Sequence, residues 1–323
     1  MGYDVVALGE LLIDFTSAEG SGEAPVFTAN PGGAPCNVLA MLAKLGRSTA
    51  FVGKVGEDLF GRFLKGAIER AGIYSGGLLL DGDPAAHTTL AFVQNAPDGD
   101  RAFSFYRDPG ADELLRAEEL PRELLESARV FHFGSLSLTR EPARTATRRA
   151  VELARRAGAI VSFDPNLRPA LWRELDKGRE EMLWGCSVCD VLKVAREELE
   201  FLTGAGDWEE GAERLRRTCP NIRLLLITDG AGESRALGEK GAAVRPACRR
   251  IRAVDTTGAG DVFCGCCLDY LLTHGWEAME EKALTEMLAF ANAAAGLVTT
   301  RKGALWSVPE KAEIYALMAE EAL

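Results

Sequence analysis

Short apolar runs rich in β-branched residues alternate along the chain with longer segments of helical periodicity. This alternation is typical of βα units arranged around a mainly parallel sheet. Buried strands are predicted at 5–9, 49–53, 130–133, 159–163, 190–194 and 224–228. Since no linker, internal repeat or low-complexity tract divides the chain, the pattern predicts a single α/β domain over residues 1–323.

The segments between the strands have the periodicity of helices, and two of them end at a glycine. Gly72 and Gly158 follow the last apolar residue of their segments, a position that favours a helix end. Thr139 precedes the second of these segments and is predicted to cap it. The expected helices lie at 59–71, 141–157, 261–272 and 277–299, and the last two are apolar enough to pack against the sheet.

One region departs from this rhythm. Residues 88–107 alternate between two faces, with a turn signal at 95–100 and with Phe103 and Phe105 on one face. Together with residues of about 15–30, this hairpin predicts a small sheet that projects from the main domain. Such a sheet is either a lid over a cleft or an ordinary edge hairpin, and the pattern favours neither.

Charge and composition restrict the classes of partner. Lys and Arg number 37 against 48 Asp and Glu, a net charge of −11, which argues against nucleic acid or an anionic membrane as a partner. The chain shows no membrane-spanning segment and no signal pattern at its start, so a cytoplasmic location is expected. The eight cysteines are expected to be reduced, buried thiols, and their spacing does not support a structural zinc site.

The segment Val-Asp-Thr-Thr-Gly-Ala-Gly-Asp-Val-Phe at 254–263 carries the clearest chemistry. The small residues Gly258, Ala259 and Gly260 let a ligand approach the backbone, and the free amides of a helix that begins here form a site for phosphate. Asp261 would repel a phosphate unless it had a role, such as accepting the proton of an attacking hydroxyl. An acidic first turn is also common at helix starts, so these residues alone leave both interpretations open.

A second glycine-containing segment, Asn-Pro-Gly-Gly-Ala-Pro-Cys-Asn at 30–37, suits a polyol. Gly33 lies in an unhindered stretch of backbone, and the Asn37 amide both donates to and accepts from hydroxyls. Asp14, just after the first strand, is a candidate partner for the same hydroxyls. An ordinary strand-to-helix turn and a turn-forming Asp are the alternatives. Neither a P-loop nor a dinucleotide-binding glycine motif occurs, which argues against those two classes.

Two signatures together point to a known family. The segment 255–263 resembles the C-terminal signature of the ribokinase-like, PfkB-type carbohydrate kinases, and 52–61 resembles their N-terminal one. The resemblance covers essentially the whole chain, and residues 9–10, 32–35 and 105–112 look most like bacterial fructokinases. It implies a ribokinase-like three-layer α/β/α domain with a mainly parallel central sheet and a small β-sheet lid.

The resemblance also implies roles for individual residues. Asp261 would be the base that activates a sugar hydroxyl, while the amides of Gly258, Ala259 and Gly260 hold the transferring phosphoryl group. The sugar would be bound by Asp14, Gly33 and Asn37, with Arg107 reaching in from the lid. ATP would be bound by Asn166, Arg168, Lys193, Thr228, Gly230, Gly260 and Asn292, the last of these beside the adenine.

Two cations are implied as well. Potassium would be held by oxygens of Asp255, Thr257, Val298, Arg301, Gly303 and Ser307. Magnesium would be held through water by Glu198, although the Asn of the family's NxxE segment is replaced by Ala195. A second departure is Asp229, which stands where the family has a small residue and adds a negative charge near the ATP phosphates.

The leading hypothesis is an ATP-dependent kinase that phosphorylates the terminal hydroxyl of D-fructose. A kinase of the same fold for aminoimidazole riboside, ribose or 2-keto-3-deoxygluconate is the close alternative, because a few pocket contacts decide the substrate. An acidic sugar would need an additional cation, and Arg107 alone does not decide this. A non-catalytic sugar sensor is disfavoured by the intact Asp261. The family often forms homodimers through the lid sheet, so a homodimer is a further expectation.

Overall fold

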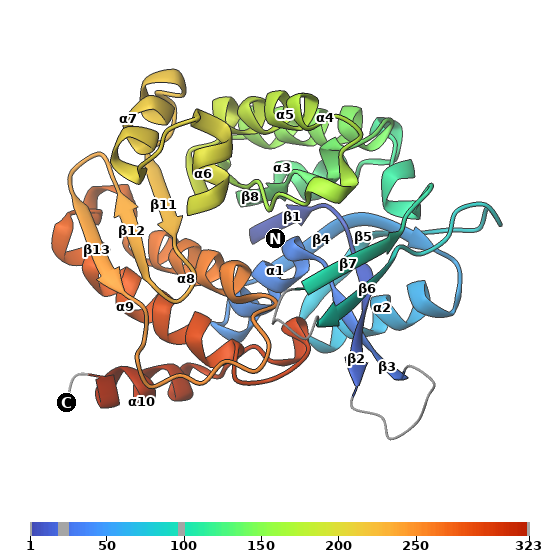
Figure 1. The fold of residues 1–323 in the computed structure, drawn as a ribbon. Helices are drawn as coiled ribbons and strands as arrows, with labels where there is room; N and C mark the ends of the chain where they lie inside the picture. Colours follow the sequence, from blue (N-terminus) through green and yellow to red (C-terminus); the bar gives the residue numbers. More distant parts are fainter. Residues whose placement is uncertain (1, 19–25, 96–100, 322–323) are drawn as a thin grey trace.

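The computed structural model describes residues 2–18, 26–95 and 101–321, and within these ranges a nine-stranded sheet forms the centre of the molecule (Figure 1). Its strand order is β13-β12-β11-β10-β9-β8-β1-β4-β5, parallel from β11 to β5 and antiparallel at β12 and β13. The strands are β1 (Tyr3–Leu8), β4 (Thr49–Gly56), β5 (Ile73–Asp81), β8 (Ala128–Gly134), β9 (Ile160–Asp164), β10 (Val191–Ala195), β11 (Leu224–Thr228), β12 (Glu233–Leu237) and β13 (Ala242–Pro246).

Helices cover both faces of this sheet, which gives the three layers implied by the sequence (Figure 1). Strand β1 shows the cause: Val5 and Ala7 face one apolar core, whereas Val6 and Leu8 face the other. The first core contains α1 (Ala34–Lys44), α2 (Leu59–Arg70), α8 (Ala259–His274), α9 (Glu281–Val298) and α10 (Lys311–Glu321). The second contains α3 (Arg122–Glu126), α4 (Ala143–Arg156), α5 (Leu175–Val188), α6 (Arg196–Thr203) and α7 (Trp208–Thr218).

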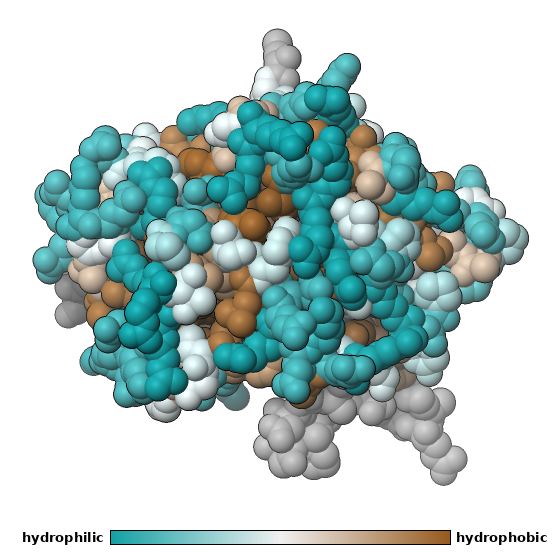
Figure 2. Space-filling view, turned by 90° about the horizontal axis from the view of Figure 1, so that it is seen from above, coloured by the Kyte–Doolittle hydropathy of each residue, from teal (hydrophilic) through white to brown (hydrophobic). Residues whose placement is uncertain are grey.

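The outer surfaces of these helices are polar. Figure 2 looks down on the molecule from above in the view of Figure 1, onto the side of α4 and α5, and hydrophilic side chains cover most of this face. Helix α4 explains part of this, because its buried residues are mainly alanine, valine and leucine, while Arg149 and Arg156 point to solvent. Among the described residues, no helix is long and apolar enough to cross a membrane.

A second, smaller sheet has the order β3-β2-β6-β7 and consists of β3 (Val26–Gly32), β2 (Leu12–Ala18), β6 (Leu90–Asn95) and β7 (Arg101–Tyr106). The small sheet expected from the sequence is therefore present. The turn expected at 95–100 lies, from residue 96 on, outside the described residues, as does the side chain of Phe103. One face of this sheet carries a row of aromatic rings, in which Phe15 and Phe92 stack with their centroids 4.8 Å apart.

The predicted strands and helices are confirmed with small shifts in their ends, but the predicted cap of α4 is wrong. Thr139 lies in a separate turn, where its hydroxyl donates to the carbonyl of Leu136 at 2.7 Å. The helix begins only after Pro142, whose ring suits a helix start, and the Glu141 carboxylate accepts from the amide of Thr145 at 3.1 Å. Strands β5, β12 and β13 were not expected from the apolar pattern.

Candidate active site

Two cavities lie where parallel strands of the large sheet end. The larger has a volume of about 620 Å³ and is bounded by residues of the small sheet, α1 and the start of α8. The smaller has a volume of about 350 Å³ and lies between β12 and α9. Thr228, Gly230, Thr256 and Gly260 line both cavities. Ligands of open α/β sheets bind at the carboxyl ends of strands, so this pair of cavities is the candidate site.

The start of α8 lies between the two cavities. Gly258 precedes the helix with a φ of 83°, a conformation that glycine adopts without strain, and a Cβ there would lie 3.0 Å from the Cβ of Ala304. At Gly260 a Cβ would lie 2.8 Å from Nζ of Lys193. The absence of side chains at these two positions leaves the first amides of the helix open toward the larger cavity, as an anion site requires.

Asp261 is buried in the first turn of this helix, with 9% of its surface exposed. Its Oδ2 accepts a hydrogen bond from Nδ2 of Asn37 at 2.8 Å. Burial raises the pKa of Asp261 to about 6, and the nearby Asp164 carboxylate adds to the rise, whereas Asn37 and Lys193 oppose it. A carboxylate with a pKa just below neutral pH is ionised at pH 7 and still basic enough to take a proton.

Lys193, at the end of β10, supplies positive charge opposite the start of α8. Its Nζ lies 3.1 Å from Oδ2 of Asp164, and both side chains are buried. Burial alone would lower the pKa of Lys193, but the carboxylates around it outweigh this effect and hold the pKa above its ordinary value. Lys193 therefore stays charged beside the anion site.

The far end of the larger cavity is lined by groups that bind hydroxyls. Asp14 lies there on β2, and burial raises its pKa to about 7, with Arg168 lowering it and Asp255 and Asp261 raising it. Asn37 has a buried Oδ1 without a hydrogen-bond partner among the described residues. Gly33 has a φ of 127°, and a Cβ at this position would lie 2.4 Å from the carbonyl oxygen of Glu10.

The smaller cavity is suited to a flat, largely apolar group. Its lining includes Cys248, Ile251 and Phe263. Asn292 on α9 also lines it, with Oδ1 accepting from Ser234 at 2.8 Å and Nδ2 donating to the carbonyl of Pro246 at 3.0 Å. The structure thus places Asn292 in the smaller cavity, Thr228 and Gly230 at the junction, and Asn166 and Arg168 in the larger cavity.

The loops at 254–257 and 298–307 lie side by side and contain the residues implied for potassium. The amides of Val254 and Asp255 both donate to the carbonyl of Thr299, at 2.7 and 3.0 Å. The buried Asp255 carboxylate accepts from the hydroxyl of Thr257 at 2.7 Å and faces the amide of Gly303 at 3.5 Å. Ser307 adjoins them, because its amide donates to the carbonyl of Gly303 at 3.1 Å. A buried carboxylate among main-chain carbonyls is a donor set of hard oxygens, which fits a monovalent cation.

Glu198 lies at the junction of β10 and α6, on the wall of the larger cavity. Its two carboxylate oxygens accept from the amides of Leu167 and Ala195, each at 2.7 Å. Burial raises the pKa of Glu198, and Lys193 lowers it. The described part of the chain has no group of three or more acidic, His or Cys side chains that could hold a metal. The single buried carboxylate of Glu198 on the cavity wall fits magnesium, which keeps several waters and relies on one or two carboxylates and substrate phosphates.

Two residues are placed differently from what the sequence suggested. Arg107 is not in the lining of the larger cavity, because its guanidinium is buried against Asp112. Asp229 forms an ion pair with Arg196, the residue after Ala195, at 3.2 Å. The negative charge of Asp229 is therefore balanced by Arg196, which belongs to the segment 195–198 in which Ala195 replaces the family's Asn.

The sequence patterns did not indicate a role for Glu10. Glu10 lines the larger cavity, is buried, and accepts from the amide of Ala34 at 2.8 Å, at the start of α1. Burial raises the pKa of Glu10 to about 7. Its position just after a buried strand, where a charged residue is uncommon, is the signal that could have identified it.

An anion site at a helix start lies beside a buried base, between a cavity that can bind hydroxyls and an apolar one. This arrangement defines a phosphotransferase that acts on an alcohol. A model of the family described as "pfkB family carbohydrate kinase" matches residues 3–311. The chain belongs to the pfkB family of carbohydrate kinases.

Several relatives are named for one sugar. Fructokinase-1 of Zea mays is 43% identical over 317 residues, covering 97% of each chain. A fructokinase with bound ATP from Xylella fastidiosa is 34% identical with a TM-score of 0.89, covering 99% of this chain and 100% of the other. An aminoimidazole riboside kinase from Salmonella enterica, complexed with aminoimidazole riboside and an ATP analog, is 29% identical with a TM-score of 0.82, covering 97% and 99%.

Proposed function

We propose that the protein transfers the γ-phosphoryl group of ATP to the terminal hydroxyl of D-fructose. The observation that carries the proposal is the placement of Asp261, held by Asn37, where the larger cavity meets the anion site. The names of the relatives support fructose as the sugar. A fructokinase double mutant from Vibrio cholerae O395, 30% identical to this chain with a TM-score of 0.87, was solved with fructose, ADP and potassium.

The reaction follows from these positions. Asp14 and Asn37 hold hydroxyls of the sugar, and Gly33 leaves room for it. Asp261 accepts the proton of the terminal hydroxyl as that oxygen forms a bond to the γ-phosphorus and the bond from this phosphorus to the β–γ bridging oxygen breaks. The amides of 258–260, together with Lys193, balance the charge on the transferring group.

The remaining groups bind and orient the nucleotide. We assign the adenine to the smaller cavity beside Asn292, and the phosphates to Asn166, Arg168, Thr228 and Gly230. Potassium would be held by oxygens of Asp255, Thr257, Val298, Arg301, Gly303 and Ser307, where its charge fixes the loop before α8. Magnesium would be held through water by Glu198 and would balance phosphate charge.

We assign the small sheet the role of a lid that excludes water from the transferring group. Phe105 of β7 lines the cavity beneath it. The other face of the sheet exposes Tyr106, which supports a homodimer formed through this sheet. We also propose a cytoplasmic location for the enzyme.

The cavity also bears on the alternative substrates. The positive charge of Arg107 is balanced by Asp112, and the cavity side presents the carboxylates of Glu10 and Asp14. Because we assign Lys193 and Arg168, the cations of this cavity, to the phosphates, the remaining charges disfavour an acidic sugar such as 2-keto-3-deoxygluconate. Aminoimidazole riboside, with ribose, is the second candidate, because the Salmonella kinase shares the fold across nearly the whole chain.

A coupled ADP-release assay over a panel of these sugars tests the substrate. We expect the highest kcat/KM with D-fructose and little ADP release without sugar. A higher kcat/KM with aminoimidazole riboside or ribose would replace fructose, and sugar binding without ADP release would indicate a sensor.

We expect kcat/KM for fructose to decrease as the pH falls through apparent values of about 7 and about 6, the pKa values of Asp14 and Asp261. Asp261 accepts a proton only when it is ionised, and Asp14 accepts hydrogen bonds from sugar hydroxyls best as a carboxylate, so protonation of either group lowers kcat/KM. The Asp14→Asn variant should retain only the step near 6. A pH profile of both proteins measures this, and a step near 7 that persists in the variant would instead belong to Glu10.

Potassium is expected to activate the enzyme by fixing the loop at 255–260, so that its amides face the phosphoryl group. Replacing potassium chloride with tetramethylammonium chloride at equal ionic strength should lower kcat/KM for ATP severalfold, because this cation is too large for the site. Equal rates in the two salts would contradict the assigned cation site.

A further inference from the structure

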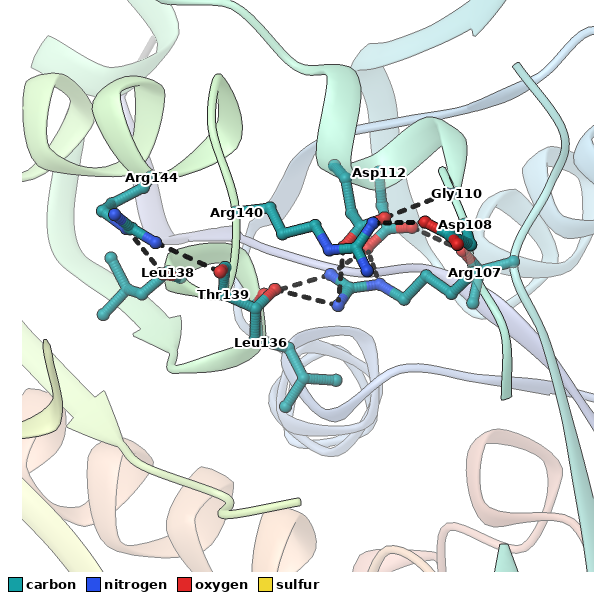
Figure 3. Close-up of polar contacts among 11 residues, drawn as sticks. Arg107, Asp108, Gly110, Asp112, Leu136, Leu138, Thr139, Arg140 and Arg144 are labelled. Atoms are coloured by element: carbon teal, nitrogen blue, oxygen red, sulfur yellow. Dashed lines mark hydrogen bonds and ion pairs between the residues drawn. The ribbon is translucent and has the colours of Figure 1, made fainter. Parts of the chain in front are cut away.

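Arg107 directly follows β7, the last strand of the lid hairpin, and its side chain is buried in the main body of the protein. Only 2% of the side chain is exposed. Figure 3 shows its guanidinium beside Asp112, with Nε and Nη2 donating to the same Oδ2 at 2.9 and 2.6 Å. A second carboxylate, Glu113, lies 3.4 Å from Nη1.

The Asp112 carboxylate joins both ends of the hairpin. Its other oxygen, Oδ1, accepts from the hydroxyl of Thr89, immediately before β6, at 2.5 Å. Gly110 lies inside this cluster, where a Cβ would come within 2.0 Å of Oγ1 of Thr89 and 2.6 Å of Oδ1 of Asp112. The two strands that enter and leave the lid are thus attached to one buried side chain.

Arg107 also reaches the wall of the sugar cavity. Its Nη2 donates to the carbonyl of Leu136 at 3.0 Å, and Leu136 lines the larger cavity. Its Nη1 donates to the hydroxyl of Thr139 at 3.0 Å. Burial alone would lower the pKa of Arg107, but the carboxylates around it, which include the cavity residue Glu10, outweigh this and raise it.

We propose that Arg107 is a positioning residue that fixes the base of the lid hairpin to the wall of the sugar cavity and does not itself bind the sugar. The inference rests on the proposed function, because it needs a sugar in the larger cavity. Loss of the guanidinium leaves the buried Asp112 carboxylate without its cation and leaves Glu113 with Arg140 alone, so the hairpin base and the segment at Leu136 shift together. Fructose affinity and water exclusion then fall together, while the nucleotide cavity is unaffected.

The variants Arg107→Met and Asp112→Asn and the double variant test this positioning role. Arg129→Met is a matched control, because it removes an exposed ion pair between an arginine and the carboxylate of Asp4. Each single variant is expected to raise KM for fructose about 10- to 100-fold. Both should leave KM for ATP unchanged and raise the ratio of sugar-independent ATP hydrolysis to sugar phosphorylation. The double variant should be no worse than the more impaired single variant, because the two residues act as one unit.

If Arg107 contacted the sugar directly, the two single variants would differ in fructose affinity. If Arg107→Met loses fructose affinity while Asp112→Asn keeps it, Arg107 is a sugar ligand and the proposal is wrong. Unchanged fructose KM in both variants also overturns it. Arg107→Lys, which restores a cation but not the paired donors, should recover part of the affinity.

Milder variants decide the question if these proteins do not fold. Thr139→Val and Thr89→Val each remove one hydroxyl of the cluster, and each should raise fructose KM about 2- to 10-fold. No change in either would overturn the proposal. The wild-type ADP-release assay is performed first: if another sugar is the substrate, the proposed function fails, and the same KM comparisons are made with that sugar.

Discussion

Replacement of Asp261 by Asn is expected to lower kcat by about 10²- to 10⁴-fold, the usual contribution of a general base, with fructose KM nearly unchanged. Asn keeps the size and polarity of the side chain, and its oxygen still accepts from Asn37, but it cannot take a proton. Steady-state kinetics with purified variant and wild type measures this effect.

The melting temperature separates this role from a structural one. The raised pKa of Asp261 means that folding disfavours its ionised form at pH 7, so the neutral Asn should keep or raise the melting temperature. If the carboxylate only stabilised the helix start, its replacement would instead lower the free energy of unfolding by about 0.3 to 1 kcal/mol and leave kcat near normal. Asp269→Asn, in the same helix but paired with Arg47, is the matched control and should keep wild-type kcat.

The second large effect is expected for Lys193→Met. Loss of a preorganised positive group at the transferring phosphoryl should lower kcat/KM for ATP by about 10²- to 10³-fold. It should also lower the melting temperature, because Asp164 and Glu198 become buried carboxylates without their cation. Kinetics and thermal melts of the same preparation give both values.

Lys54→Met is a matched control for this variant. Lys54 is also buried and paired with two carboxylates, Asp81 and Glu119, but it lines neither cavity. We expect it to lower the melting temperature while kcat/KM of the folded protein stays near that of the wild type. If Lys193→Met behaves in the same way, Lys193 has only a structural role.

The sequence predicts the central strands well because both faces of these strands are buried. Every residue of β4 is buried, and its residues 49–53 form an uncharged, mostly apolar run. Strand β13 lies at the edge and β12 lies next to it. In both strands buried positions alternate with less buried ones and charged residues occur, and such short strands give a weaker signal. In β5 two glycines interrupt the run.

Part of the candidate site could also be predicted, because it depends on short segments of the sequence. The backbone around Gly33 and Gly258 needs glycine because of positive φ values, so these segments could be identified from the sequence. The partners of individual side chains could not be identified in this way. Whether Arg107 faces a sugar or Asp112, and whether Asp229 repels phosphate or pairs with Arg196, depends on side-chain directions that follow from packing. The prediction that Thr139 caps α4 was wrong for the same reason.

Phosphorus NMR of a reaction with ATP and D-fructose tests the central claim most directly. The account predicts that ADP and a sugar phosphate form in equal amounts, with the new phosphorus signal coupled to methylene protons, as expected for a phosphorylated terminal hydroxyl. Release of inorganic phosphate with no sugar ester, or an ester at a secondary hydroxyl, would contradict the account.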